Sequence, residues 1–244
     1  MITLGGKPFE PSVLISKLSS EKAGMVMLMN SYKKIYRFNT LAELEFILEA
    51  KILITKAARL LADSGAEFET FKNSRCNPDY WDLHESGAFF LKEGRAPHQA
   101  IDDIFQNGKL YAFECATAMV IVFYKAVMGL IGPLRFDRLF TEMYLFDWEY
   151  NTKLTLETFR STDFLPGDCV YFRNPDHHPD TPEWQGENCI VLDVDLYFAH
   201  GIGIGTGEEI MAVLNSLRKP NPEEPAYLED VLTRLDALAY YTEL

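Results

Sequence analysis

The chain has 244 residues, and its 23 lysines and arginines face 36 aspartates and glutamates, so the formal net charge is −13. A hydrophobic fraction of 48% with 24% charged residues is typical of a folded protein and excludes a disordered chain. The acidic balance also argues against nucleic-acid binding, which requires clustered lysines and arginines. A negative surface instead suits cationic partners such as lysine-rich proteins.

The start of the chain does not resemble an export signal, because Lys7, Pro8, Glu10 and Pro11 interrupt its apolar residues. The longest apolar stretch, residues 116–124, is far shorter than the roughly 20 residues that span a bilayer. We therefore expect synthesis in the cytoplasm without a signal peptide, and no membrane partner.

Helices dominate the chain after an N-terminal segment of residues 1–39. The capping-box pattern at residues 40–43, with apolar residues at helical spacing up to Gly65, predicts a core helix of about six turns. A second helix is predicted from Pro97 to Asn107, because proline suits the first turn and Asn-Gly ends it.

The segment from Phe113 to Met128 is apolar on nearly every face, which predicts a helix buried in the middle of the domain with Cys115 at its start. A short helix is predicted near residues 135–145. A turn at residues 166–168 then leads into a predicted strand at residues 169–172.

Residues 173–185 form a polar loop, and the β-rich runs 187–192 and 196–200 predict a hairpin. A last helix is predicted at residues 208–217, followed by a proline-bearing tail, residues 218–244, that packs on the domain. Helices followed by strands indicate an α+β fold, with the helices packed on a small antiparallel sheet in a single compact domain.

Cys115 is the best candidate for a nucleophile, because the free N–H groups at a helix start favour a thiolate. A pKa of 6 or below would raise the reactive fraction about 30-fold over an ordinary thiol. His200 is the preferred partner among five histidines, since it ends a strand and precedes a glycine-rich stretch. Cys169 and Cys189 are expected to be core residues, and Cys76 a loop residue.

The hairpin offers a third group to orient His200. If its turn is Asp193-Val194, Glu187 lies directly across from His200, whereas a three-residue turn places Asn188 there. A carboxylate and an amide can both accept the imidazole N–H, and the sequence pattern leaves both registers open.

Four separated blocks of residues carry a resemblance to the bacterial spore-associated transglutaminases of Bacillus and its relatives. These blocks are Tyr111-Ala112-Phe113-Glu114-Cys115-Ala116-Thr117-Ala118, Gly167-Asp168-Cys169 with Tyr171-Phe172, Trp184 with Gly186-Glu187-Asn188, and Tyr197-Phe198-Ala199-His200-Gly201. The resemblance implies a papain-like cysteine-hydrolase core, a single transglutaminase domain over residues 1–244, and no calcium or other cofactor.

The resemblance also implies roles. Cys115 is the nucleophile, His200 the general acid and base, and Glu187 its acidic partner. The implied reaction joins protein glutamine to protein lysine by an isopeptide bond through a thioester, with release of ammonia. The implied partners are glutamine- and lysine-bearing proteins, expected to be those of the spore coat or spore surface.

Transfer requires that water be kept from the thioester, so we expect aromatic walls around the sulfur. The candidates are Phe68, Trp148, Tyr171 and Trp184. Glu114 could assist the triad, although its position at the helix start already explains an acid there. The sequence differs from the family pattern at Cys189 and in the acidic loop 176–183, which puts substrate preference in doubt.

Two other functions remain open at this stage. The same three catalytic residues could serve a peptidase or amidase with water as acceptor, or the cysteine could be inert in a binding or coat protein. A metal site at Asp176, His177, His178 and Asp180 is disfavoured, because adjacent histidines in such a loop point apart. No metal and no cofactor are therefore expected.

Overall fold

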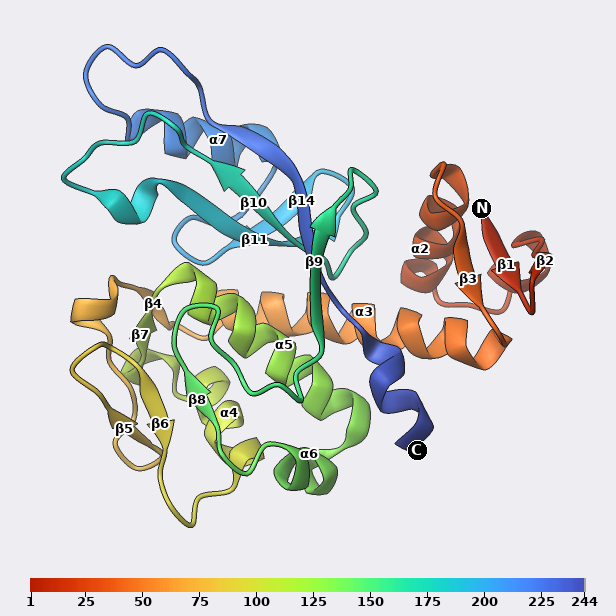
Figure 1. The fold of residues 1–244 in the computed structure, drawn as a ribbon, viewed down its shortest axis with the longest axis horizontal. Helices are drawn as coiled ribbons and strands as arrows, with labels where there is room; N and C mark the ends of the chain where they lie inside the picture. Colours follow the sequence, from red (N-terminus) through yellow and green to blue (C-terminus); the bar gives the residue numbers. More distant parts are fainter. Residues whose placement is uncertain (244) are drawn as a thin grey trace.

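The structure is a computed structural model that describes residues 1–243, with no account of the side chains of Val13, Thr242 and Glu243. Two long helices, α3 (Leu41–Asp63) and α5 (Cys115–Ile131), pack against each other beneath a six-stranded sheet (Figure 1). The sheet is antiparallel throughout, in the order β13-β12-β11-β10-β14-β9. The predicted α+β class is confirmed.

Helix α3 has the predicted start and length. The Thr40 hydroxyl caps it by accepting the Glu43 N–H at 3.2 Å, whereas the Glu43 carboxylate accepts from Asn39. The predicted start of α5 at Phe113 is wrong by two residues. Ala112–Phe113 form strand β7, which pairs in parallel with β4 (Glu67–Phe68), so the helix begins only at Cys115.

The main sheet carries a core on each face. Its strands are β9 (Leu156–Arg160), β10 (Cys169–Arg173), β11 (Gly186–Asp193), β12 (Leu196–Ala199), β13 (Gly203–Gly205) and β14 (Tyr227–Leu235). One face contributes Cys169, Ile190 and Phe198 to the core around α5. The other face packs against α7 (Gly207–Ser216), whose N-terminus is closed by a Thr206–Glu209 capping box.

Strands β9 and β14 are absent from the predicted elements. Strand β14 lies inside the sheet between β10 and β9, so residues 227–235 are a structural part of the sheet. The burial pattern along β14 does not alternate cleanly, and a register irregularity accompanies its pairing with β10. A weak period-2 pattern gives little strand signal.

Smaller elements surround the start of α5. Helix α4 (Pro97–Gln106) is confirmed, whereas the helix predicted near residues 135–145 is shorter, α6 (Pro133–Leu139), and is followed by strand β8 (Tyr144–Leu145). Strand β8 joins β5 (Trp81–Leu83) and β6 (Phe89–Leu91) in a separate sheet. Short 3-10 turns are η1 (Phe71–Asn73), η2 (Gly108–Leu110), η3 (Pro182–Trp184) and η4 (Ala237–Glu243).

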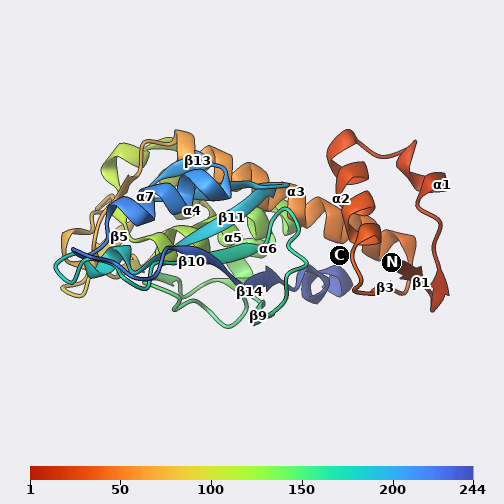
Figure 2. The ribbon, with the colours of Figure 1, turned by 90° about the horizontal axis from the view of Figure 1, so that it is seen from above.

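The N-terminal segment forms a lobe with its own apolar cluster on the first half of α3. Its elements are β1 (Ile2–Leu4), β2 (Lys7–Pro8), α1 (Ser12–Ile15), α2 (Ser20–Ser31) and β3 (Tyr36–Phe38). Figures 1 and 2 both show this lobe at one end of the molecule, and Figure 1 shows β4 and β7 toward the other end. It therefore lies far from the start of α5, where Cys115 sits.

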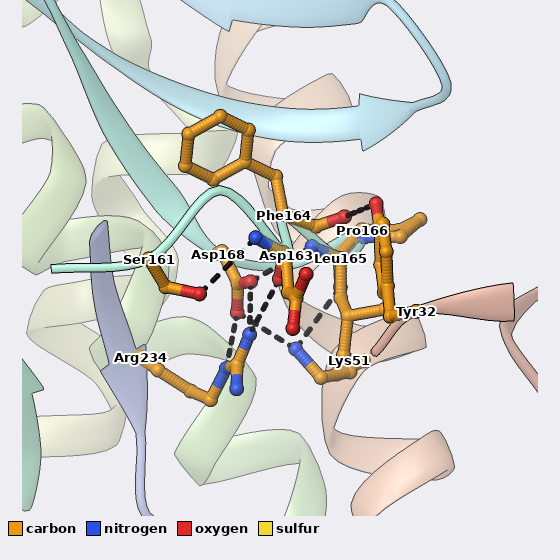
Figure 3. A network of polar contacts seen from close by, with 9 residues as sticks. All are labelled: Tyr32, Lys51, Ser161, Asp163, Phe164, Leu165, Pro166, Asp168 and Arg234. Atoms are coloured by element: carbon orange, nitrogen blue, oxygen red, sulfur yellow. Dashed lines mark hydrogen bonds and ion pairs between the residues drawn. The ribbon is translucent and has the colours of Figure 1, made fainter. Parts of the chain in front are cut away.

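A buried ion network connects α3, the turn before β10 and strand β14 (Figure 3). Asp168, fully buried, accepts from Lys51 Nζ at 2.8 Å and from Arg234 at 2.8 and 2.6 Å, and also from the Leu165 N–H at 2.8 Å. Nearby, the Tyr32 hydroxyl donates to the Phe164 carbonyl at 2.7 Å and so attaches the N-terminal lobe to the same turn.

Within the described residues, no helix combines the length and apolarity that crossing a membrane demands.

Candidate active site

Cys115 is the first residue of α5 and is only 2% exposed. Strand β7 and the N-cap residue Glu114 set its position, because the Glu114 carboxylate accepts the Ala116 N–H at 2.7 Å and fixes the first turn. Most of the remaining residues of the helix are apolar and buried, Lys125 being the charged exception, so they hold its axis in the core. The thiol is thus fixed at the point where the helix dipole is positive.

Two polar side chains contact the sulfur. The thiol donates to Glu114 Oε1 at 2.9 Å, and the side-chain amide of Asn188 donates to the sulfur at 3.4 Å. One Glu114 carboxylate oxygen thus caps the helix, and the other accepts from the thiol. Among the described residues, Glu114 is the carboxylate within hydrogen-bond distance of the sulfur.

The sequence-based expectation of a lowered thiol pKa is wrong for this resting structure. Burial raises the pKa of Cys115 well above its usual value, and the charges of Glu187 and Glu114 raise it further. The backbone N–H of Asn188 lowers it only in part. Desolvation and two nearby carboxyl groups outweigh the helix dipole, so the sulfur is held as a thiol that donates to Glu114.

His200 follows the last residue of β12 and lies against β4 and β7. Its Nε2 donates to the Glu67 carbonyl at 3.1 Å, and its ring stacks on Phe113 with centroids 4.6 Å apart. Burial lowers the pKa of His200 to about 4, although the carbonyls of Glu67 and Phe113 act to raise it. The imidazole is therefore neutral at pH 7, and it lies beside the residue two positions before Cys115.

Glu187 is completely buried, and neither carboxylate oxygen makes a hydrogen bond of good geometry to a described residue. Burial and the neighbouring Glu114 charge raise its pKa to about 8, against the lowering effect of the His200 and Gly201 backbone N–H groups. Glu187 thus carries its proton at pH 7. A protonated carboxyl near a buried thiol is typical of an active site.

The hairpin has the register in which Asn188 is aligned with His200. Strand β11 pairs Cys189 with Ala199, Ile190 with Phe198 and Val191 with Tyr197, and a bulge precedes the turn. Continuing this register by one residue places Asn188 across from His200, while the Glu187 carboxyl lies near the backbone N–H groups of His200 and Gly201. Of the two registers that the sequence left open, the one that aligns Asn188 with His200 therefore forms, and it arises from a bulge beside the two-residue turn Val194-Asp195.

A cavity of about 690 Å³ opens in front of Cys115. Trp148 and Tyr171, two of the predicted aromatic residues, line it. The other two lie on the His200 side: Phe68 packs against Trp184 at 5.1 Å and against His200 at 6.3 Å between ring centroids. The predicted aromatic residues thus divide between the two sides of the site.

The cavity also has an acidic lining that the sequence did not indicate. Four acidic residues reach it from separate segments, namely Glu114, Asp147, Glu183 and Glu229, and its lining includes no lysine, arginine or histidine. No spacing pattern connects these positions, because the fold brings them together from α5, the loop after β8, η3 and β14.

The remaining cysteines and histidines lie elsewhere. Cys169 and Cys189 are buried in strands β10 and β11, on opposite core faces, and Cys169 also borders the cavity. Asp176 binds Lys219 at 2.6 Å and caps two backbone N–H groups. In the part of the chain that the structure describes, no three His, Cys, Asp or Glu side chains are placed to hold a metal ion.

Comparison with known proteins gives one consistent result. The family model described as protein-glutamine gamma-glutamyltransferase matches residues 1–242. A protein of that name from Halalkalibacterium halodurans is 41% identical over 98% of this chain and 84% of its own length. One from Bacillus mycoides is 43% identical over 97% of this chain and 87% of its own length.

A solved structure agrees with these relatives. The transglutaminase from Geobacillus stearothermophilus, solved without its C-terminal extension, superposes with a TM-score of 0.79 at 46% identity. The match covers 84% of this chain and 97% of that one.

Proposed function

Since the chain belongs to the protein-glutamine gamma-glutamyltransferase family, we propose that it crosslinks proteins by transferring a glutamine side-chain acyl group to a lysine amine, with Cys115 as the nucleophile. The observation that carries this proposal is the Cys115 thiol, which donates to Glu114 at 2.9 Å and borders a cavity of about 690 Å³. A buried thiol beside a proton acceptor and an open cavity is the arrangement that acyl transfer through a thioester requires.

In the first half-reaction, Cys115 Sγ attacks the carboxamide carbon of a protein glutamine. Glu114 is in position to receive the thiol proton. Backbone N–H groups at the start of α5 stabilise the oxyanion. The Ala116 N–H is not one of them, because it already donates to Glu114. Glu114 then delivers this proton to the amide nitrogen, and the family resemblance assigns His200 and Glu187 to assist that transfer. The carbon–nitrogen bond breaks, ammonia leaves, and a thioester remains.

In the second half-reaction, a lysine amine attacks the thioester carbonyl carbon. The amine loses one proton to these same groups, the carbon–sulfur bond breaks, and the sulfur recovers a proton. The product is an isopeptide bond. His200 is neutral and Glu187 is protonated at pH 7, so the site offers both an acceptor and a donor of protons.

The proposal includes activity without calcium and a place in the spore coat. Independence from calcium is supported by the resemblance to the family. The spore-coat role is supported by the family resemblance, and it predicts that the protein co-fractionates with purified spore coats and crosslinks their proteins.

The decisive experiment measures incorporation of a fluorescent primary amine into a glutamine-bearing protein in the presence of a calcium chelator, together with ammonia release. We expect both signals from the wild type and neither from Cys115→Ala. Ammonia without incorporated amine would indicate a glutamine amidase, and the absence of both signals would overturn the assignment.

A further inference from the structure

Two of the four acidic residues in the cavity have no partner in the part of the chain that the structure describes. Glu114 is engaged with Cys115 and the Ala116 N–H, and Glu229 forms an ion pair with Arg173. The carboxylates of Asp147 and Glu183 make no hydrogen bond or ion pair, although both residues are partly buried and line the cavity. They are therefore two unneutralised negative charges on the path to the sulfur.

Asp147 is held beside the nucleophile by the backbone. Its N–H donates to Thr117 Oγ1 at 2.9 Å, and Thr117 is buried in the first turn of α5, two residues after Cys115. A tight turn surrounds Asp147, closed by the Glu149 N–H donating to the Phe146 carbonyl at 2.9 Å. The position of Asp147 is thus tied to that of the reacting atom.

The backbone of Asp147 is also unusual. Its φ is +51°, in the left-handed region that side chains other than glycine, asparagine and aspartate rarely adopt. Such strain persists only where surrounding contacts over-determine it, as the Thr117 bond and the closed turn do here. The turn also places Trp148, the next residue, in the cavity wall.

The two sides of the site differ in charge. The cavity in front of Cys115 has four acids and no cation in its lining, whereas Phe68, Trp184 and the neutral His200 form an aromatic cluster elsewhere around it. A carboxamide can only donate hydrogen bonds to unpaired carboxylates, whereas a lysine ammonium is also attracted by their charge. The charge distribution therefore separates the two substrates of the reaction.

We propose that Asp147 and Glu183 bind the ammonium group of the acceptor lysine, so that the acidic cavity is the entrance for the amine substrate. This inference rests on the proposed function and adds its acceptor specificity. The carboxylates hold the cation near the thioester, and the proton is then transferred to the catalytic groups before the nitrogen attacks. The two carboxylates act by binding the amine substrate, so their removal should raise the KM for the amine.

The test compares the wild type with Asp147→Asn, Glu183→Gln and the double variant. Asparagine tolerates the left-handed backbone, so Asp147→Asn removes the charge and preserves the turn. With the cationic amine cadaverine, we expect the KM to rise about tenfold in the double variant, which corresponds to about 1.4 kcal/mol. The KM for the glutamine substrate and ammonia release without an amine stay within about twofold.

A neutral nucleophile supplies the second arm of the test. Hydroxylamine carries no charge at pH 7, so its KM should not change in the double variant. Raising the salt concentration should weaken cadaverine use by the wild type more than by the double variant. Glu149→Gln, an exposed acid in the same turn that does not line the cavity, is the matched control and should behave as the wild type.

An unchanged KM for cadaverine in the double variant would overturn the inference, as would an equal loss with hydroxylamine and cadaverine. Failure of the proposed function is distinguishable from both, because the wild type would then neither release ammonia from glutamine nor incorporate either amine.

Discussion

Cys115 lies among groups that keep it protonated until a substrate arrives. The thiol pKa is raised by burial and by two carboxyl groups, so a freely reactive thiolate is not the resting state. The Glu114 carboxylate lies 2.9 Å from the sulfur and accepts from the thiol, so the thiol proton can be transferred to it once a substrate has bound. This arrangement favours attack on a bound carboxamide over reaction with small thiol reagents.

Replacing Cys115 tests whether it is the nucleophile of the reaction. Cys115→Ala should abolish both amine incorporation and ammonia release, because no other described side chain presents a nucleophile next to Glu114 at the cavity. The change removes one buried sulfur, so the circular dichroism spectrum should be unchanged. Residual crosslinking by the purified variant would contradict the assignment of Cys115.

Glu187 should make stability depend on pH. Its pKa of about 8 in the folded protein exceeds the ordinary 4.5, so the folded state binds the proton more tightly and its stability falls as the pH rises from 4.5 through 8. Glu187→Gln removes this effect. Because each pKa unit is worth about 1.4 kcal/mol, the variant should be more stable than the wild type at pH 9 by a few kcal/mol.

The measurement is urea unfolding of both proteins at pH 5 and pH 9, with equal midpoints expected at pH 5. A wild type that loses no stability relative to Glu187→Gln at pH 9 would show that folding does not raise the pKa of the Glu187 carboxyl. In the activity assay the same variant should be weakened but not inactive, because Glu114 still contacts the sulfur.

At the scale of elements, the Asp168 network decides how the sheet is attached to α3. Asp168 binds Lys51 of α3 and Arg234 of β14, so one carboxylate connects a core helix to two segments of the sheet (Figure 3). The two cations lower the pKa of Asp168 despite complete burial, and burial lowers the pKa of Lys51 to about 8. The charge state of each of these three groups therefore depends on the other two.

Removing the shared anion should cost more than removing one cation. Asp168→Asn leaves Lys51 and Arg234 buried without a counter-charge, for which we expect a loss of about 3–5 kcal/mol in the free energy of unfolding. Lys51→Met should cost less, because Arg234 still pairs with Asp168 through two hydrogen bonds. Urea unfolding at pH 7 provides the comparison.

The matched control is Asp82→Asn, which removes the exposed Lys92–Asp82 pair, leaves the Lys92 bond to the Pro78 carbonyl in place, and should change stability by less than about 1 kcal/mol. Equal losses for Asp168→Asn and Asp82→Asn would mean that the buried network contributes no more than a surface ion pair.

At the scale of the whole molecule, α3 joins two apolar clusters. Its first half packs against the N-terminal lobe through Leu44, Leu48 and Ile52, and its second half packs against α5. In Figure 1 the lobe lies at the opposite end of the molecule from β7, the strand that directly precedes Glu114 and Cys115. Because one helix serves both clusters, we expect the lobe and the catalytic part to unfold together.

Leu48→Ala tests this coupling. Leu48 is 0% exposed in the N-terminal cluster, and truncating such a residue costs about 2–5 kcal/mol. We expect one calorimetric transition at a lower temperature, with activity retained below it. The control Leu60→Ala changes a side chain on the same helix that is 53% exposed, and should have little effect. Two separate transitions in Leu48→Ala would show that the lobe unfolds independently.

Local patterns were enough to predict much of the architecture. The capping residue and apolar spacing predicted α3, proline and Asn-Gly predicted α4, and the absence of a polar face predicted that α5 is buried. These signals are contained within a few turns of chain, and the structure confirms them. Strands β9 and β14 could not be predicted this way, because their place in the sheet depends on partners distant in sequence.

The sequence by itself determined the family, the α+β class and the choice of Cys115, His200 and Glu187 as candidates, because these depend on residue types in ordered blocks. Only the tertiary structure decided that Glu114 faces the sulfur, that the register aligns Asn188 with His200, and that four acids surround the cavity. The physical reason is that charge and desolvation act through space, so the pKa of each group depends on which distant segments the fold brings together.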